Sequence, residues 1–329
     1  MERILSVVIP VYNEEQALWE LYGELAKQIH AAIQQGLISD YEVIFVNDGS
    51  TDKSKEFITE IIATDPHVYL INLRKNFGKS EALQTGFRHV GGDIIITMDA
   101  DLQDDPAELI HFIQTLDNGF DLVSGWKFNR QDPLHKRLPS KLFNAITSIL
   151  SGIKLHDFNC GYKAYRREVT DSIDVYGELH RYIPVLAKQN GFNITEIKVH
   201  HRKRKFGKSK FGWSRYQRGF FDSLTTTFLL RFHDKPMYFF GKIGLLALLT
   251  GFVICIYLTV LWFMGQSIGT RPLLMFGVLC IILGVQSIST GFVADMIVAS
   301  SYRNSHSINH IKSIVTAESI NEEKKKSDK

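Results

Sequence analysis

Two aspartates, Asp99 and Asp101, stand one residue apart, and Gln103 follows them. Carboxylate and amide oxygens in so compact a group are the ligands that hard divalent cations such as Mg²⁺ or Mn²⁺ prefer. The preceding run 93–97 is short, apolar and rich in β-branched residues, which indicates a buried strand. We therefore predict a metal site at the carboxyl end of this strand, where a cation would neutralise a diphosphate. The alternative is a solvated acidic turn before a helix that Pro106 begins.

Three more polar clusters follow apolar runs earlier in the chain. The clusters 12–15, 47–52 and 74–79 follow the runs 5–11, 41–46 and 68–73. Strict alternation of strand and helix predicts right-handed crossovers and a mostly parallel, doubly wound α/β sheet. Ligands of such sheets bind outside the carboxyl ends of the strands, so we expect all four clusters to line one cleft.

The segment Gly78-Lys79-Ser80 ends like a phosphate-binding P-loop. That motif requires a glycine five residues before Gly78, where this chain has Leu73. The same test fails for Gly207-Lys208-Ser209, because Arg202 occupies the corresponding position. The sequence therefore argues against a P-loop NTPase.

Length and composition set the outer bounds. The 329 residues suffice for a catalytic domain and a smaller part, and the formal net charge is +3. The three cysteines form no disulfide or metal-ligand pattern, which indicates a reducing compartment. The apolar run that ends at Pro10 is too short for a signal peptide, so we expect the first domain in the cytoplasm.

Basic residues follow a further strand predicted at 121–126. They are Lys127, Arg130, Lys136, Arg137 and Lys141. The segment 138–153 then has apolar residues at helical spacing. This pattern fits either an element on an anionic membrane surface or an ordinary amphipathic helix on the sheet.

A second basic run, 200–210, follows an edge strand predicted at 192–199. Taken alone, such a run fits a nucleic-acid patch or a solvated loop. Aromatic residues at helical spacing follow it between 213 and 224, with arginines between them, which is a membrane-interface pattern. We therefore predict contact with a lipid bilayer and no nucleic-acid partner.

Two uncharged apolar spans, 243–264 and 273–294, are each close in length to the ~20 residues that a helix needs to cross a bilayer. Basic residues flank the outer ends of the pair and only Arg271 lies between them, which places both termini in the cytoplasm. Asp295 is expected to cap the cytoplasmic interface. The predicted parts are a catalytic domain at 1–212, an amphipathic juxtamembrane segment at 213–236, two transmembrane helices at 237–300 and a partly disordered tail at 301–329.

The segments 8–14, 47–52, 76–79 and 99–103 resemble, in order, the motifs of family 2 inverting glycosyltransferases. Over roughly residues 4–300 the chain is similar to polyisoprenyl-phosphate glycosyltransferases such as dolichol-phosphate mannose synthase and bacterial bactoprenol glucosyltransferases. The resemblance implies a GT-A fold, Rossmann-like with a mostly parallel sheet, followed by interface helices and two transmembrane helices in a bacterial plasma membrane.

The resemblance also assigns roles to individual residues. It places the nucleotide sugar at Pro10, Tyr12, Glu14, Asp48, Lys79, Asp99, Ser209 and Lys210, the metal at Asp99, Asp101 and Gln103, and the lipid phosphate at Lys127, Arg137 and Lys141. The catalytic candidates are Asp101, Asp157 and Arg204. Of these, Asp157 would orient the sugar or the phosphate, and Arg204 begins a loop that closes over the diphosphate in relatives.

The implied reaction is the inverting transfer of a single sugar to undecaprenyl phosphate at the cytoplasmic membrane face, for modification of cell-envelope glycans. Glucose from UDP-glucose is the first donor we consider, with GDP-mannose and a mannosyltransferase as an alternative. A processive polysaccharide synthase would carry a Gln-x-x-Arg-Trp motif that this chain lacks. A catalytically silent nucleotide-sugar-binding scaffold is disfavoured by the intact Asp99 and Asp101. The resemblance to membrane-bound relatives is also compatible with a homo-oligomer.

Overall fold

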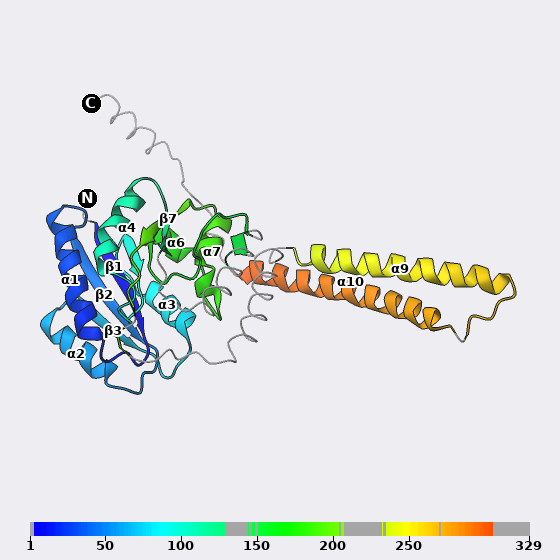
Figure 1. The fold of residues 1–329 in the computed structure, drawn as a ribbon, viewed down its shortest axis with the longest axis horizontal. Coiled ribbons are helices and arrows are strands. Elements are labelled where there is room, and N and C mark those ends of the chain that lie inside the picture. The colour runs from blue at the N-terminus through cyan, green and yellow to red at the C-terminus, as the bar shows by residue number, and fades with distance from the viewer. Residues whose placement is uncertain are drawn as a thin grey trace, which may run out of the picture. The chain divides into compact units, whose positions relative to one another are not determined.

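The computed structural model describes residues 3–128, 144, 147–148, 151–203, 205–206, 232, 235–269 and 271–304. The chain divides into two compact units, Met1–Thr227 and Phe228–Lys329. The first unit contains one seven-stranded sheet, and the second contains two long apolar helices (Figure 1).

The sheet of the first unit is parallel except for one strand. Its strands are β1 (Ile4–Val11), β2 (Asp40–Asn47), β3 (Val68–Asn72), β4 (Ile94–Thr97), β5 (Leu122–Lys127), β6 (Lys163–Arg166) and β7 (Ile194–Val199). Their order is β3-β2-β1-β4-β6-β5-β7, and β6 runs antiparallel to both of its neighbours. The predicted mostly parallel α/β sheet is confirmed. Strand β6 is not predictable from the sequence, because it has only four residues and carries a charge at each end.

Helices cover both faces of this sheet, as a doubly wound fold requires. They are α1 (Leu18–Gln34), α2 (Ser54–Thr64), α3 (Lys79–Phe87), η1 (Pro106–Glu108), α4 (Leu109–Asp117), α6 (Arg167–Asp171), η2 (Leu179–Arg181) and α7 (Ile183–Gln189). Because successive side chains of a strand point to opposite faces, Leu5, Val7 and Ile9 join the core formed with α1, α2 and α4. Val8 joins the core formed with α3, α6 and α7.

The strand order explains why the four polar clusters meet. Strands β3, β2, β1 and β4 are neighbours and parallel, so their carboxyl ends lie along one edge of the sheet. Each cluster directly follows one of these ends. The predicted convergence on one edge is therefore confirmed by the topology.

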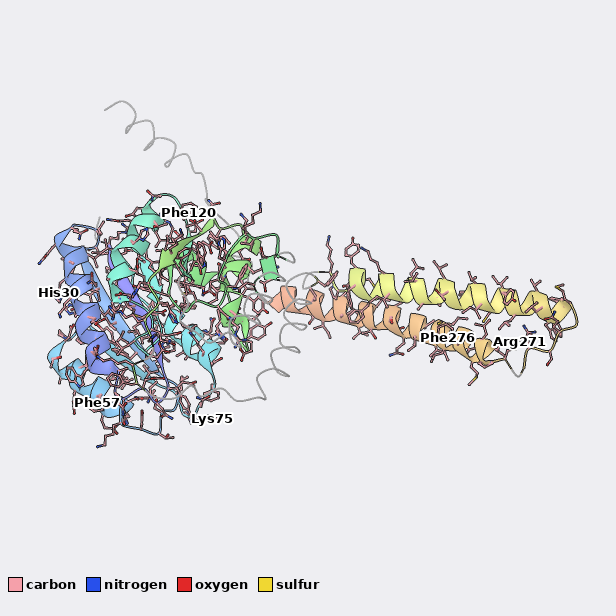
Figure 2. The ribbon with its side chains drawn as sticks, viewed as in Figure 1. His30, Phe57, Lys75, Phe120, Arg271 and Phe276 are labelled. Atoms are coloured by element: carbon pink, nitrogen blue, oxygen red, sulfur yellow. The ribbon has the colours of Figure 1, made fainter. Side chains whose placement is uncertain are left out.

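The second unit is a helical hairpin of α9 (Met237–Phe263) and α10 (Pro272–Asn304). The spans Met237–Phe263 and Pro272–Val298 are long and apolar enough to cross a membrane, with mean hydropathies of 2.5 and 2.1. Figure 2 shows Arg271 in the connection between the helices, with Phe276 further along α10. The backbone N–H of Met237 donates to Asp295 Oδ1 at 3.1 Å, so Asp295 caps the start of α9, and its predicted place at the cytoplasmic interface stays a prediction.

Candidate active site

The loop after β1 is tied to the loop after β2 by hydrogen bonds between backbone and side chains. The N–H of Asn13 donates to Ser50 Oγ at 3.0 Å, and the N–H of Thr51 donates to Asn13 Oδ1 at 2.7 Å. Asn13 has a left-handed backbone (φ 53°), which asparagine tolerates better than most residues. These bonds fix the edge that carries Pro10, Tyr12 and Glu14, the residues predicted to contact the nucleoside.

Asp48 connects the loop after β2 to the start of α3. Its two carboxylate oxygens accept hydrogen bonds from the N–H groups of Phe77, at 2.7 Å, and Gly78, at 2.9 Å. Burial raises the pKa of Asp48, and the two N–H bonds only partly offset this effect. Gly49, beside it, has a φ of 67°, and a Cβ there would lie 2.4 Å from the carbonyl carbon of Lys75. The structure thus packs the second and third loops against each other.

Asp99, directly beyond β4, forms an ion pair with Lys79, the first residue of α3. Burial opposes ionisation of Asp99, but the positive charges of Lys79 and Lys127 outweigh it and hold the pKa of Asp99 well below its usual range. Gly161 lies against the same carboxylate, because a Cβ at Gly161 would lie 2.7 Å from it. Lys79 and Asp99, both predicted to contact the nucleotide sugar, therefore meet directly.

A tight turn presents Asp101 and Gln103. Leu102 between them has a left-handed backbone (φ 59°) and a buried side chain, and the N–H of Gln103 donates to Asp101 Oδ1 at 3.2 Å. Gln103 Nε2 lies 3.4 Å from His201 Nε2, so the turn also contacts the segment after β7.

The donor set at this turn can be compared with what a divalent cation requires. Among the described residues, no three His, Cys, Asp or Glu side chains gather around one point. Mg²⁺ is commonly held by one or two carboxylates together with substrate phosphates and water. Asp99, Asp101 and Gln103 supply two carboxylates and one amide, which is the type of donor set that such a shared cation uses, and the metal site stays a prediction.

Lys127 ends β5 and reaches the same loop. Its Nζ lies 3.2 Å from Oδ1 of Asp104, whose side chain is 1% exposed, and the N–H of Asp99 donates to Asp104 Oδ2 at 3.3 Å. Burial works against the charge of Lys127, but Asp104 and, more weakly, Cys160, Asp99 and Asp157 raise its pKa above its usual value. The predicted lipid-phosphate lysine therefore lies beside the predicted metal loop, paired with an aspartate that the sequence analysis did not select.

Asp157 begins a buried turn that leads into β6. Its Oδ1 accepts a hydrogen bond from the N–H of Asn159 at 3.0 Å, and the residue is 3% exposed. The Lys163 amine donates to the carbonyls of Cys160 and of Phe158, the latter at 3.4 Å. Burial lowers the pKa of Lys163 and raises that of the Cys160 thiol to about 12. Lys163 was also missed from sequence, because nothing local marks it as buried.

Five predicted site residues fall outside the described part of the chain. They are Arg137, Lys141, Arg204, Ser209 and Lys210. The described start of the second basic run pairs with acidic residues. Arg202 lies 2.5 Å from Glu24 and 2.7 Å from Asp105, and Lys205 lies 2.7 Å from Glu20.

Comparisons with solved structures identify this arrangement as a GT-A fold. Glucosyl-3-phosphoglycerate synthase from Mycobacterium tuberculosis, in complex with Mn²⁺, UDP and phosphoglyceric acid, aligns with a TM-score of 0.52. The alignment has 19% identity and covers 68% of this chain and 78% of that chain. The complex of the same enzyme with Mg²⁺ and UDP aligns with a TM-score of 0.51.

Sequence comparisons identify the family. The model of the family described as "Glycosyl transferase family 2" matches residues 6–174. Dodecaprenyl-phosphate galacturonate synthase of Rhizobium johnstonii is 36% identical over 93% of this chain and 91% of its own length. Undecaprenyl-phosphate 4-deoxy-4-formamido-L-arabinose transferase of Photorhabdus laumondii is 34% identical over 89% of this chain and 88% of its own length. The chain therefore belongs to glycosyl transferase family 2, among relatives that are polyprenyl-phosphate sugar transferases.

Proposed function

We propose that this protein transfers one sugar from a nucleotide-diphosphate sugar to a polyprenyl phosphate, with inversion at the anomeric carbon. The observation that carries the proposal is the chain of contacts from Lys79 through Asp99 and Asp104 to Lys127. It joins the edge that would hold the donor diphosphate to the lysine that would meet the acceptor phosphate. The donor diphosphate and the acceptor phosphate, both highly negative, would therefore meet at one short loop.

On the donor side, Pro10, Tyr12, Glu14 and Asp48 would surround the nucleoside, and Lys79 would contact the diphosphate. Asp99, Asp101 and Gln103 would hold a Mg²⁺ or Mn²⁺ ion. Such an ion, when bound, stabilises the negative charge that develops on the departing diphosphate. The Mn²⁺ and UDP complex of the structural neighbour with the same fold supports a divalent ion and a UDP donor.

On the acceptor side, the lipid phosphate needs no protein base. A phosphate monoester has a second pKa near ~6, so its oxygen is already largely ionised at neutral pH. This oxygen would attack the anomeric carbon, the bond from that carbon to the donor phosphate would break, and the nucleoside diphosphate would leave. Lys127 would hold the acceptor phosphate. The buried Asp157, fixed by its bond to Asn159, would orient the sugar or the phosphate.

The sugar, the lipid and the membrane side are part of the same proposal. The relatives carry galacturonate or formamido-arabinose in their names, and glucose from UDP-glucose remains the first donor to test here. Undecaprenyl phosphate is the proposed acceptor. We place the catalytic unit and both termini at the cytoplasmic face of a bacterial plasma membrane, with α9 and α10 as the anchor.

The experiment incubates the purified full chain with undecaprenyl phosphate, Mg²⁺ or Mn²⁺, and a panel of UDP- and GDP-sugars. Mass spectrometry follows the lipid, with Asp101→Ala as the comparison. The proposal expects one added sugar in the wild type and none with Asp101→Ala or EDTA. A polymer on the lipid would indicate a processive synthase, and retention of configuration would contradict the direct attack. Nucleotide-sugar binding without product for every donor would indicate a silent scaffold.

A further inference from the structure

His180 is joined to the start of α3 by two hydrogen bonds that share one hydroxyl. The backbone N–H of His180, in η2, donates to Ser80 Oγ at 3.2 Å, and the ring Nδ1 lies 2.8 Å from the same oxygen. Ser80 is 2% exposed, and it directly follows Lys79, the residue that pairs with Asp99. The histidine is therefore held beside the edge of the sheet at which the donor would bind.

A second group of contacts fixes the segment that leads to His180. Gln84, on α3, accepts a hydrogen bond from the N–H of Val175 at 2.6 Å and donates to Asp174 Oδ1 at 3.4 Å. Ser80 and Gln84 are four residues apart, so they lie on one face of α3. The segment 174–180 is thus bonded to α3 at two successive turns, and α3 determines where the His180 ring lies.

The contacts at Ser80 assign the proton of the His180 ring to one nitrogen. The Ser80 oxygen accepts the backbone N–H of His180, and among the described residues Nδ1 is the acceptor within reach of the hydroxyl proton. The Ser80 O–H therefore donates to Nδ1, and a neutral ring then carries its own proton on Nε2. Burial, together with the positive charges of Lys79 and Arg181, lowers the pKa of His180 well below its usual value, so the ring is neutral at neutral pH.

The Nε2–H group of His180 is available to a ligand. The ring is partly exposed, and among the described residues Nε2 has no hydrogen-bond partner. The charges of the site with the largest effect on this ring are those of Lys79, Lys163 and Asp99, rather than that of Lys127. The ring therefore lies on the donor side of the site. An uncharged N–H suits an uncharged hydroxyl, whereas the phosphates would be met by the lysines.

We propose that Nε2–H of His180 donates a hydrogen bond to a hydroxyl of the donor sugar, which makes His180 a specificity-determining residue. The inference rests on the proposed function, because it requires a nucleotide sugar at the edge formed by Lys79 and Asp99. Ser80 fixes the ring and its tautomer before the sugar arrives, so the bond requires little reorganisation. A sugar without a hydroxyl at this position would leave the N–H unpaired, and the site would discriminate against it.

Two substitutions separate the roles of the two ring nitrogens. The amide of asparagine reaches about as far as Nδ1 of histidine, and the amide of glutamine reaches about as far as Nε2. His180→Asn therefore keeps a group that can contact Ser80 and removes the donor to the sugar, whereas His180→Gln restores a donor near the position of Nε2. His89→Asn is the matched control, because Nδ1 of the exposed His89 contacts the carbonyl oxygen of Thr85 at 2.8 Å.

Isothermal titration calorimetry of the purified full-length protein in detergent with Mn²⁺ tests the inference. The ligands are UDP, GDP and the panel of UDP- and GDP-sugars, and the measurement needs no turnover. For the nucleotide sugar that the wild type binds most tightly, we expect His180→Asn to raise the Kd roughly 2- to 10-fold, the range for one hydrogen bond between neutral groups. The Kd of the corresponding free nucleotide diphosphate should stay unchanged. His180→Gln should recover part of the loss, and His89→Asn should change neither Kd.

The outcomes distinguish this inference from the proposed function. An equal rise in Kd for the nucleotide sugar and the free nucleotide diphosphate, or no rise for either, would overturn the role of His180 and leave the proposed function standing. A His180→Gln protein that binds the sugar no better than His180→Asn would also contradict the hydrogen bond. If the wild type bound none of the nucleotide sugars, the proposed function would fail, and the role of His180 would fail with it.

Discussion

The buried pair of Asp104 and Lys127 gives a prediction that is worked out from the structure. The side chain of Asp104 is 1% exposed and that of Lys127 is 10% exposed, with 3.2 Å between Oδ1 and Nζ. Removing one partner of a buried pair costs about 3–5 kcal/mol, because the other charge stays buried without compensation. We expect Asp104→Asn to lower the free energy of unfolding by about 3 kcal/mol, the lower end of that range, since Lys127 keeps some access to water.

The measurement is thermal unfolding of the full-length protein in one detergent, followed by intrinsic fluorescence. For a unit of this size, about 3 kcal/mol corresponds to a fall in Tm of roughly 6–12 °C. The double variant Asp104→Asn with Lys127→Met removes both charges and should recover most of this loss. Glu178→Gln is the control, because it breaks the partly exposed pair of Glu178 with Arg181 at 3.0 Å and should cost less than about 1 kcal/mol.

Two results would refute this reasoning. One is a Tm of Asp104→Asn that is as close to the wild type as that of Glu178→Gln. The other is a double variant whose loss equals the sum of the two single losses, because additivity would mean that the two charges do not interact. Activity gives a separate readout, since under the proposed function Lys127→Met should raise KM for the lipid phosphate more than KM for the donor.

Three further predictions concern the site edge and the core. Gly161→Ala would place a Cβ 2.7 Å from the Asp99 carboxylate, so we expect kcat/KM for sugar transfer to fall at least about tenfold, measured with saturating Mn²⁺ to separate catalysis from metal binding. Asp48→Ala removes the acceptor of two N–H groups and should lower stability by roughly 2 kcal/mol in urea unfolding, whereas an unchanged midpoint would contradict its linking role. Burial opposes ionisation of Asp65, but the hydroxyls of Tyr22 and Tyr41 outweigh it and lower its pKa from 3.8 to about 2. Because the pKa of Asp65 is lower in the folded state, its ionised carboxylate stabilises the fold above about pH 4, and this stabilisation is lost as the pH falls toward 2. The urea midpoint of the wild type should therefore decline more steeply between about pH 4 and 2 than that of Asp65→Asn.

Much of the fold could be predicted because it depends on patterns within single segments. The apolar runs that became β1 to β5 and β7, and the spans of α9 and α10, are long or regular enough to be identified individually. The common edge followed from strand and helix alternation, since parallel strands end on the same side. The antiparallel β6 could not be identified in this way. It has four residues, and it is a strand only because β4 and β5 bond to it on both sides.

The candidate site shows the same division. The sequence alone determined that Asp99, Asp101, Gln103, Asp48 and Lys79 belong to one edge, because each follows a strand end or begins the next helix. Only the tertiary structure decided the partners of these residues. Along the chain, Asp104 precedes α4 and Lys127 follows it. They meet because β5, which ends at Lys127, lies next to β6 in the sheet, and β6 lies next to β4, which leads into the aspartate loop. Lys163 is buried for the same reason. Spacing along the chain fixes which side chains share a face, whereas ion pairs and burial depend on contacts between distant segments that form only when the sheet is complete.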